Sequence, residues 1–279
     1  MDIAARGYAN PDILWSPDML KARLGQPGLT VIDTRRAEDY ASGHIEGAGH
    51  FDPYFVNCDD TDPAPLRSFT RMWAEMLAWR GANTGDTIVF YGAFSDNCAA
   101  RAWWFVEYLG HKDVHVLDGG IQAWQAAGLP LVQDATAPKP GKFAWSQAMD
   151  TVGSYRTVLD AIDDDAWVIL DNRGPGEWDG SENRAKQNGH VPNARHLNWV
   201  ELYDHETGLY KDAAALRALY EARGATPDKT IICYCNTGFR SAHSYLALRL
   251  LGYPSLRNYV GSWQEWGNRD GMPVVKPAA

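Results

Sequence analysis

Two cysteines and an arginine stand close together in the segment CYCNTGFRSAH, residues 233–243. Cys235 follows the apolar, β-branched run TIICY and precedes a helix-forming stretch, so residues 236–240 are predicted to form a tight loop between a strand and a helix. Backbone N–H groups in such a loop point inward, and the helix dipole adds partial positive charge. The loop and the nearby Arg240 therefore both favour a thiolate at Cys235. The chemistry that this pattern predicts is nucleophilic attack by sulfur.

The remaining residues of the segment have expected supporting roles. Gly238 permits a backbone conformation that a side chain would resist, and Ser241 is the expected N-cap of the helix. Cys233, two residues earlier on the strand, is expected to be buried and inert, and a disulfide with Cys235 would be strained at this separation. No second Cys/His pair completes a tetrahedral zinc site, so no metal is expected.

Composition limits the classes of protein to consider. The chain has 279 residues, enough for one large domain or two ordinary ones, of which two are expected. Its composition, 45% hydrophobic and 22% charged residues, is that of a soluble globular protein. Its formal net charge of −9 argues against general nucleic-acid binding. The apolar stretches are far shorter than the roughly 20 residues of a membrane span, and the N-terminus lacks the basic start and apolar core of a secretory signal. Four cysteines fit a reducing compartment. We therefore expect a cytoplasmic protein with no membrane or nucleic-acid partner.

The chain contains one unit written twice. LTVIDTRRAEDYASGHIEGAGHF in the first half matches AWVILDNRGPGEW and NGHVPNARHL in the second, and DTIVFYGAFSDNCAARAWW matches KTIICYCNTGFRSAHSYLA. Asp33 and Asp171 are 138 residues apart (171 − 33), and Gly92 and Cys235 are 143 apart (235 − 92). Two offsets this similar indicate a duplication with small insertions.

Each copy alternates short β-branched runs with stretches whose apolar spacing is near 3.6 residues, which is typical of an α/β fold. We expect two tandem domains, each a mostly parallel sheet with helices on both faces. The proline-rich stretch DATAPKPGKFAW separates them. The predicted division is an N-terminal domain of residues 1–137, a linker of residues 138–146 and a C-terminal domain of residues 147–279. Ligands of such sheets lie beyond the carboxyl ends of the strands, where CNTGFR is found.

These motifs together resemble the tandem-domain rhodanese family, which comprises thiosulfate and 3-mercaptopyruvate sulfurtransferases. The resemblance extends nearly end to end, through VIDTR and ILDNR, SGHIEGAGH and NGHVPNARHL, the loop CNTGFRS and the ending LLGYPSLRNYVGSWQEWGNRDGMPV. In this family the N-terminal copy lacks the nucleophile. The chain follows that division, because Gly92 stands where Cys235 stands in the other copy and the loop GAFSDN has no cation. The resemblance thus implies a non-catalytic N-terminal domain and a catalytic C-terminal rhodanese-like domain.

The resemblance implies a sulfurtransferase that works in two steps. The Cys235 thiolate attacks the outer sulfur of thiosulfate, sulfite leaves, and a persulfide remains on Cys235. A thiophilic acceptor such as cyanide, a small thiol or a protein thiol then takes the outer sulfur. No cofactor is expected beyond the covalent persulfide. The backbone N–H groups expected to hold the persulfide belong to Asn236, Thr237, Gly238, Phe239 and Arg240.

Three arginines are candidates for binding the donor. Arg240 is expected to supply positive charge for its sulfonate or carboxylate end. Arg173 either contacts the donor or anchors the fold by pairing with a carboxylate, and Asp171 is expected to orient either the backbone or Arg173. Arg184 either contacts the donor or lies on the solvated surface.

Other polar and aromatic residues are expected to have structural roles. His44 and His190 occupy equivalent turns of both copies, one of which is inactive, and Cys98 stands at the start of a helix. Trp263 is expected to form a hydrophobic wall beside the thiolate, with Trp124 at the matching place in the other copy.

Alternatives differ in donor or in class. The arginine at the sixth position of CNTGFR and the segment GSWQEWGN are similar to bacterial thiosulfate-type enzymes, so thiosulfate is the expected donor and 3-mercaptopyruvate the alternative. A cysteine phosphatase or arsenate reductase would need five residues between cysteine and arginine, but four separate Cys235 from Arg240. A non-catalytic binding module is disfavoured because the cysteine loop is complete.

Overall fold

The structure, a computed structural model, describes residues 2–54, 56–135, 137 and 139–276. The chain folds into two compact units. Unit 1 comprises Met1–Val56, Ser68–Ala148 and Tyr203–Tyr210, and unit 2 comprises Asn57–Arg67, Met149–Leu202 and Lys211–Ala279. Each unit therefore includes a short segment from the other half of the sequence, which a division into consecutive domains did not foresee.

Both of these short segments are held by hydrogen bonds within the unit that they join. In unit 1, the Gly208 carbonyl accepts a hydrogen bond from the Ser95 N–H at 2.9 Å. In unit 2, the N–H and the hydroxyl of Thr61 donate to the buried carboxylate of Glu265 at 2.8 and 2.7 Å. Neither segment is a free loop.

The predicted linker also belongs to unit 1, although residue 138 lies outside the described residues. The Gly141 N–H donates to the Ala78 carbonyl at 2.7 Å, and the Ser146 N–H donates to the Leu109 carbonyl at 3.1 Å. Residues 141–148 thus run along unit 1 as an ordered part of it, and the chain passes into unit 2 after Ala148.

Unit 1 is built on a five-stranded sheet of order β1-β5-β4-β2-β3, in which every strand pair is parallel. Its strands are β1 (Leu14–Trp15), β2 (Leu29–Asp33), β3 (Gly49–His50), β4 (Thr87–Tyr91) and β5 (Val114–Leu117). Its helices are η1 (Ile3–Arg6), η2 (Pro11–Ile13), α1 (Pro17–Arg23), α2 (Ala37–Ser42), α3 (Pro63–Trp79), α4 (Asn97–Tyr108) and α5 (Gly120–Ala126). The division between the units falls inside α3.

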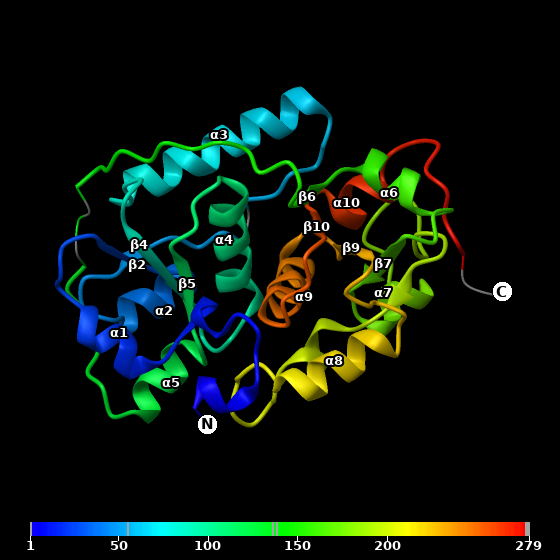
Figure 1. Cartoon of the computed structure of the whole chain (residues 1–279). Coiled ribbons are helices and arrows are strands. Elements are labelled where there is room, and N and C mark those ends of the chain that lie inside the picture. Colours follow the sequence, from blue (N-terminus) through cyan, green and yellow to red (C-terminus); the bar gives the residue numbers. More distant parts are fainter. Residues whose placement is uncertain (1, 55, 136, 138, 277–279) are drawn as a thin grey trace. The chain divides into compact units, whose positions relative to one another are not determined.

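Unit 2 repeats this architecture with a parallel sheet of order β6-β10-β9-β7-β8 (Figure 1). Its strands are β6 (Val152–Gly153), β7 (Trp167–Asp171), β8 (Arg195–His196), β9 (Thr230–Tyr234) and β10 (Leu256–Tyr259). Its helices are α6 (Tyr155–Ala161), α7 (Pro175–Asp179), η3 (Trp199–Leu202), α8 (Ala213–Glu221), α9 (Phe239–Leu250) and α10 (Ser262–Trp266).

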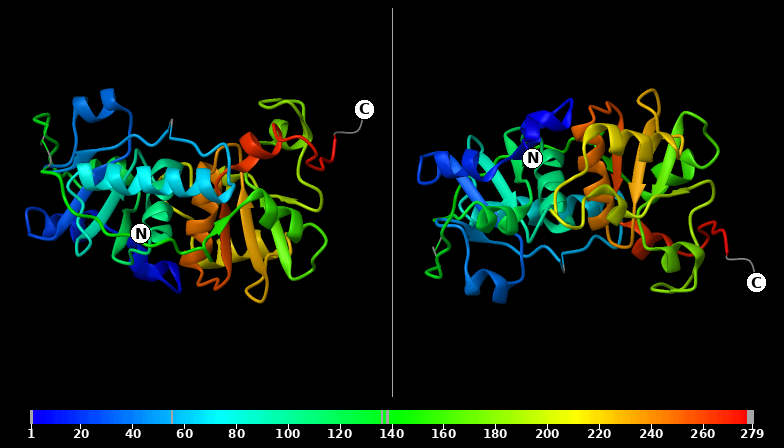
Figure 2. Two further views of the ribbon diagram at one scale, coloured as in Figure 1. Left: turned by 90° about the horizontal axis from the view of Figure 1, so that it is seen from above. Right: turned by 90° about the horizontal axis from the view of Figure 1, so that it is seen from below.

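Apolar side chains fill both faces of each sheet, as expected for buried parallel strands. In unit 2, Ile232 and Tyr234 of β9 pack with Val158 of α6 and Trp266 of α10 on one face. Helix α9 packs on β9 and β10. Figure 2 shows, for each sheet by itself, strands running side by side and helices lying against both faces. The predicted α/β fold with helices on both faces is confirmed.

Among the described residues, no helix has the length and apolar character needed to cross a membrane.

Candidate active site

Cys235 lies directly after β9, where this central strand ends and the chain turns into α9. Gly238 is the N-cap of α9 and has φ 85°, a left-handed conformation that favours glycine. The prediction that Gly238 adopts a backbone conformation unfavourable for other residues is therefore confirmed. The prediction that Ser241 caps the helix is wrong, because the N-cap is Gly238, three residues earlier, and α9 begins at Phe239.

The sulfur of Cys235 sits among hydrogen-bond donors of this turn. The Gly238 N–H donates to Sγ at 3.1 Å, and the Ser241 hydroxyl lies 3.6 Å from it. Backbone N–H groups of Thr237 and Ser241 also favour the anion. Burial raises the pKa of the Cys235 thiol, but the charge of Arg240 and these hydrogen bonds outweigh burial, so the pKa lies below its ordinary value. The site is built to hold a thiolate.

The structure brings part of the predicted cradle to the sulfur. Thr237 and Gly238 are there, and the Ser241 N–H, which the sequence did not place in the cradle, joins them. The Asn236 carbonyl accepts a hydrogen bond from the Gln264 N–H at 2.8 Å, which ties the loop to α10. That the amides of residues 236–240 hold a persulfide stays a prediction.

Ser262 fixes the backbone of Cys235. Its hydroxyl accepts a hydrogen bond from the Cys235 N–H at 3.1 Å and donates to the Tyr259 carbonyl at 2.7 Å. Ser262 has φ 50°, and its counterpart in unit 1 is Gly120 with φ 55° (262 − 120 = 142). A serine thus occupies a strained conformation that glycine occupies in the other copy. In the sequence, Gly119-Gly120 of the first copy is replaced by Gly261-Ser262 in the second, and this difference could have identified Ser262 as a functional residue.

Asn258 supports the loop from the adjacent strand β10, where it stands opposite Cys233. Its Oδ1 accepts a hydrogen bond from the Ser241 hydroxyl at 2.7 Å, and its Nδ2 donates to the Gly238 carbonyl at 3.4 Å. The counterpart in unit 1 is Val116 (258 − 116 = 142). Asn258 is a polar residue at a strand position that is apolar in the other copy, and this difference could have identified it as part of the site.

Arg240 is held by a carboxylate that the sequence did not single out. Its two terminal nitrogens donate to Glu177 of α7 at 2.5 and 2.9 Å. Arg184 is exposed and lies 3.7 Å from the same carboxylate. Burial raises the pKa of Glu177, but the hydrogen bonds and charge of Arg240 lower it by more. The pKa therefore lies below its ordinary value and the carboxylate is ionised. Arg240 and Arg184 therefore belong to one charge cluster beside the loop.

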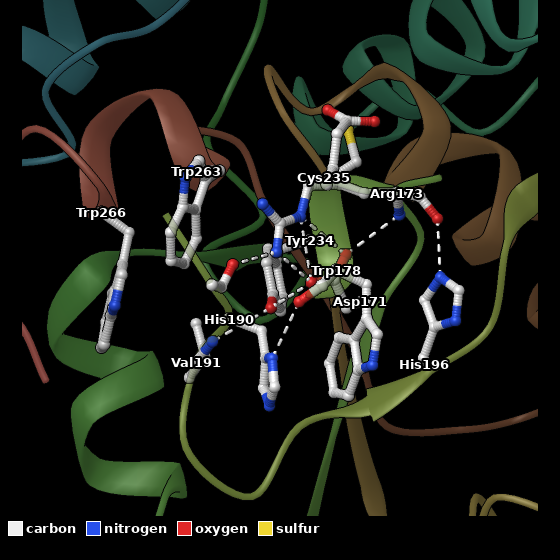
Figure 3. A network of polar contacts seen from close by, with 12 residues as sticks. Asp171, Arg173, Trp178, His190, Val191, His196, Tyr234, Cys235, Trp263 and Trp266 are labelled. Carbon is white, nitrogen blue, oxygen red and sulfur yellow. Dashed lines mark hydrogen bonds and ion pairs between the residues drawn. The ribbon is translucent and has the colours of Figure 1, made fainter. Parts of the chain in front are cut away.

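Arg173 lies in the core of unit 2, where Figure 3 shows it between Asp171 and Trp263. Its guanidinium donates to both carboxylate oxygens of Asp171 at 2.6 to 3.0 Å and to the Gly189 carbonyl at 2.8 Å. The side chain is only 2% exposed. Of the two roles that the sequence left open, this placement favours the anchor and argues against contact with a donor.

Unit 1 contains the same anchor, which supports this reading. Arg35 donates to Asp33 at 2.6 Å and to the Gly43 carbonyl at 2.7 Å. Since unit 1 has no cysteine in its loop, the arginine–aspartate pair serves the fold in both copies. The expectation that Asp171 orients Arg173 is confirmed.

The histidines of both copies have the structural surroundings that were expected. His190 stacks on Trp178 with ring centroids 3.6 Å apart, and its Nδ1 contacts the Trp178 carbonyl at 3.0 Å. His44 stacks on Tyr40 at 3.8 Å and contacts the Tyr40 carbonyl at 2.9 Å.

The matching of the tryptophans needs correction. The indole of Trp124 donates to the Pro130 carbonyl at 2.9 Å, and that of Trp266 donates to the Pro273 carbonyl at 2.9 Å. Trp266 is therefore the counterpart of Trp124 (266 − 124 = 142). Trp263 packs its ring on the Arg173 guanidinium, 4.3 Å away, while its backbone N–H donates to the Cys235 carbonyl at 3.0 Å.

Cys233 and Cys98 are poor candidates for chemistry. Burial raises the pKa of Cys233 to about 12, and its thiol lies 3.7 Å from the Ser244 hydroxyl. Burial, followed by the charge of Asp96, also raises the pKa of Cys98. Both thiols are therefore protonated near neutral pH, as expected for structural cysteines.

The corresponding loop of unit 1 is filled by a side chain of its own. The Asp96 carboxylate accepts hydrogen bonds from the N–H groups of Ala93, Cys98 and Ala99 at 2.7, 3.0 and 3.1 Å. A β-carbon on Gly92 would meet Oδ2 of Asp96 at 1.9 Å. The amides of this turn thus bind an internal carboxylate, at the place where unit 2 presents its thiol.

Within the described part of the chain, no group of three or more His, Cys, Asp or Glu residues could hold a metal ion.

Comparisons with known proteins agree with the duplicated architecture. The family model described as a rhodanese-like domain matches residues 16–127 and 154–269. The sulfur carrier protein TtuD of Thermus thermophilus is 36% identical over 97% of this chain and 99% of its own length. A thiosulfate sulfurtransferase of Azotobacter vinelandii is 33% identical over 96% and 98% of the two chains.

Solved structures give the same result. SseA of Escherichia coli, described as a 3-mercaptopyruvate sulfotransferase with the rhodanese fold, superposes with a TM-score of 0.77 at 28% identity, covering 91% of this chain and 99% of that one. EanB in complex with ergothioneine superposes with a TM-score of 0.84, covering 97% of this chain and 71% of that one. At 20% identity this likeness concerns the fold alone.

Proposed function

The chain belongs to the rhodanese-like family in two tandem copies, and from this premise we propose that it is a thiosulfate sulfurtransferase using Cys235 as its sulfur carrier. One observation carries the proposal most directly. The Cys235 sulfur accepts the Gly238 N–H at 3.1 Å, inside a turn that lowers the pKa of the thiol. A thiolate held in this way is both the nucleophile and the leaving group that sulfur transfer needs.

In the first step, the Cys235 thiolate attacks the outer sulfur of thiosulfate. The new S–S bond forms as the bond to the sulfonate sulfur breaks, and sulfite leaves with its electron pair. In the second step, a thiophile such as cyanide attacks the outer sulfur of the persulfide, which yields thiocyanate and returns the thiolate. In each step the nucleophile supplies the electron pair of the new bond and the leaving group takes the pair of the broken bond, so the cycle requires no oxidant or reductant.

The turn has the same task in both steps. Backbone N–H groups of Thr237, Gly238 and Ser241 stabilise negative charge at the sulfur of Cys235. In the persulfide the charge moves one atom outward, from Sγ to the terminal sulfur. We propose that the inward-facing amides of residues 236–240 follow the charge to that atom.

Thiosulfate is the proposed donor because relatives named thiosulfate sulfurtransferase match this chain at 33% identity over nearly the whole length. The alternative, 3-mercaptopyruvate, is favoured by the structural likeness to SseA. It would leave as pyruvate, with the thiol proton passing to carbon. The name of the relative TtuD, a sulfur carrier protein, favours a protein thiol among the acceptors.

We also propose that the reaction takes place in the cytoplasm. All four cysteines lie within the described residues and are thiols rather than disulfides, and a reducing compartment keeps the thiol of Cys235 available.

Mass spectrometry after incubation with each donor tests the proposal. The peptide that contains Cys235 is expected to gain about 32 Da, the mass of one sulfur atom, and to lose it on addition of cyanide. Cys235→Ser should show no gain, whereas the matched variant Cys233→Ser should behave like the wild type. If neither donor adds sulfur to the folded protein, the sulfurtransferase proposal fails.

The choice of donor is tested by steady-state kinetics. Release of sulfite from thiosulfate and of pyruvate from 3-mercaptopyruvate is followed with cyanide as the common acceptor. The proposal expects the higher kcat/KM for thiosulfate, and the reverse order would assign the enzyme to the mercaptopyruvate class.

A further inference from the structure

Glu177 is a buried carboxylate on a short helix, and no role in the chemistry has been assigned to it. Its side chain is 5% exposed, while that of its partner Arg240 is 17% exposed. A buried carboxylate is stable only when it is paired and hydrogen-bonded. The pairing of Glu177 is therefore a built feature of this part of unit 2.

The contact between the two side chains fixes the arginine in orientation as well as in position. Both terminal nitrogens of Arg240 bind the two oxygens of Glu177, at 2.5 and 2.9 Å, in a bidentate arrangement. The carboxylate is fixed in turn by the Gly174 N–H, which donates to Oε2 at 3.2 Å, and by Arg184, 3.7 Å from Oε1.

Arg240 lies in the first turn of α9, two residues after Gly238. Among the interactions that favour the Cys235 thiolate, the charge of Arg240 is the largest. An unrestrained arginine side chain has many rotamers and tends to extend its charge into water. A partner that restricts the guanidinium to one orientation keeps its charge within reach of the sulfur.

The two copies of the repeat differ at both positions. The helices α4 and α9 both span 12 residues, so the counterpart of Arg240 is Cys98 (240 − 98 = 142), and that of Glu177 is Asp39 (177 − 39 = 138). The side chain of Asp39 is 46% exposed and pairs with Arg36 at 3.2 Å. The buried carboxylate–guanidinium pair thus occurs in the copy that has the cysteine and is missing from these positions in the copy that has glycine.

We propose that Glu177 is a positioning residue, which holds the Arg240 guanidinium where its charge stabilises the thiolate and the persulfide of Cys235. The inference deepens the proposed function, because a sulfur carrier needs its anion stabilised throughout the cycle. Glu177 acts through Arg240 and does not touch the sulfur.

Glu177 also carries a negative charge, which by itself would disfavour a thiolate. The neighbouring charges compete, so the sign of the effect is a test. If positioning is the dominant effect, removing the carboxylate raises the pKa of Cys235. If direct repulsion dominates, removing it lowers the pKa. The charged and titratable groups around the pair and the sulfur are Glu177, Arg184, Asp171, Arg173, Cys233 and Arg240.

The experiment is the pH dependence of iodoacetamide alkylation at Cys235, followed by mass spectrometry of its peptide in the full chain. We expect Glu177→Ala to raise the apparent pKa by about one pH unit, which reduces the alkylation rate at neutral pH by up to about tenfold. Glu177→Asp, which is too short for the bidentate contact, should shift the pKa in the same direction. Glu177→Gln keeps the shape and one hydrogen-bond acceptor, so it should raise the pKa less than Glu177→Ala does. It replaces the alanine variant in the test if that variant does not fold.

Two further variants separate positioning from general destabilisation. Arg240→Ala should raise the pKa as Glu177→Ala does, and the double variant should add little, because both changes remove the same interaction. Glu182→Ala is the matched control, since Glu182 is an exposed carboxylate that also lies near Arg184, at 3.9 Å. It should leave the profile unchanged.

An unchanged or lowered pKa in a folded Glu177→Ala protein would overturn the inference. Alkylation needs no sulfur donor, so the result stands apart from the proposed function. Absence of the persulfide in the wild type would refute sulfur transfer and leave the alkylation profile readable.

Discussion

Asp96 stands where a side chain on Gly92 would have to be, because a β-carbon at residue 92 would lie 1.9 Å from its Oδ2 and 2.3 Å from its Cγ. The carboxylate also accepts three backbone hydrogen bonds from the turn. The Asp96 carboxylate therefore fits in the turn only when residue 92 has no side chain. A thiol at residue 92 requires Asp96 to move out of the turn.

Gly92→Cys tests this relationship. The new side chain must displace Asp96, so we expect a loss of about 1–3 kcal/mol in the free energy of unfolding, as for overpacked sites. Thiosulfate should add no sulfur to the thiol introduced at this position. Urea unfolding and mass spectrometry give the two readings.

The matched control for that variant is Gly85→Cys, because a β-carbon on Gly85 meets no atom within 4 Å. It should change stability by less than about 0.5 kcal/mol. A Gly92→Cys protein as stable as this control, or one that gains sulfur at residue 92, would show that Asp96 yields easily.

Ser262 offers a test of strain against hydrogen bonding. Ser262→Ala keeps a side chain at φ 50° and removes the hydroxyl that bonds the Cys235 N–H. Ser262→Gly removes the hydroxyl but relieves the left-handed strain, which costs about 1–2 kcal/mol for a residue with a β-carbon. Both variants should be less stable than the wild type, with glycine about 1 kcal/mol better than alanine in urea unfolding. Equal stability of the two variants would refute a strained serine.

Asn258→Val reproduces in unit 2 the residue that unit 1 has at this position. The Ser241 hydroxyl and the Gly238 carbonyl lose their partner. A buried group left unpaired costs about 1–3 kcal/mol, so persulfide formation should slow by about tenfold or more in rapid-mixing experiments. Ile231→Val, a core change in the neighbouring strand β9, should cost about 1 kcal/mol of stability without slowing the reaction. Equal rates in the two variants would exclude a role for Asn258 in shaping the turn.

The lowered pKa of Cys235 predicts how stability depends on pH. Because the folded protein releases this proton at lower pH than the unfolded chain, the contribution is fully present above the ordinary cysteine pKa of about 8.5 and is lost as pH falls through the folded pKa. The stability difference between the wild type and Cys235→Ser should therefore grow in favour of the wild type from about pH 6 to about pH 9, as measured by urea unfolding. A difference that is constant or shrinks over this range would contradict a stabilised thiolate.

Much of the site was predictable because it follows from local sequence. The apolar run before Cys235 predicted a strand, the glycine predicted a special turn, and the duplication revealed the same scaffold around Gly92. The pair Glu177–Arg240 was not predictable, because it joins residues 63 apart (240 − 177) and depends on how α7 presents its carboxylate. Two predictions at the ends of elements were wrong for a related reason. The N-cap was placed at Ser241 and Trp124 was matched with Trp263, since sequence spacing alone does not locate the turn that precedes each helix.

Because each unit includes a segment from the other half of the sequence, dividing the chain at a single position does not yield two complete units. A polypeptide ending at Ala148 would lack Tyr203–Tyr210, whose Gly208 carbonyl takes the Ser95 N–H. A polypeptide beginning at Met149 would lack Thr61, which satisfies the carboxylate of Glu265. Each unit is therefore completed by a segment encoded in the other half of the sequence. A deletion within Asn57–Arg67 is expected to affect unit 2, and a deletion within Tyr203–Tyr210 is expected to affect unit 1.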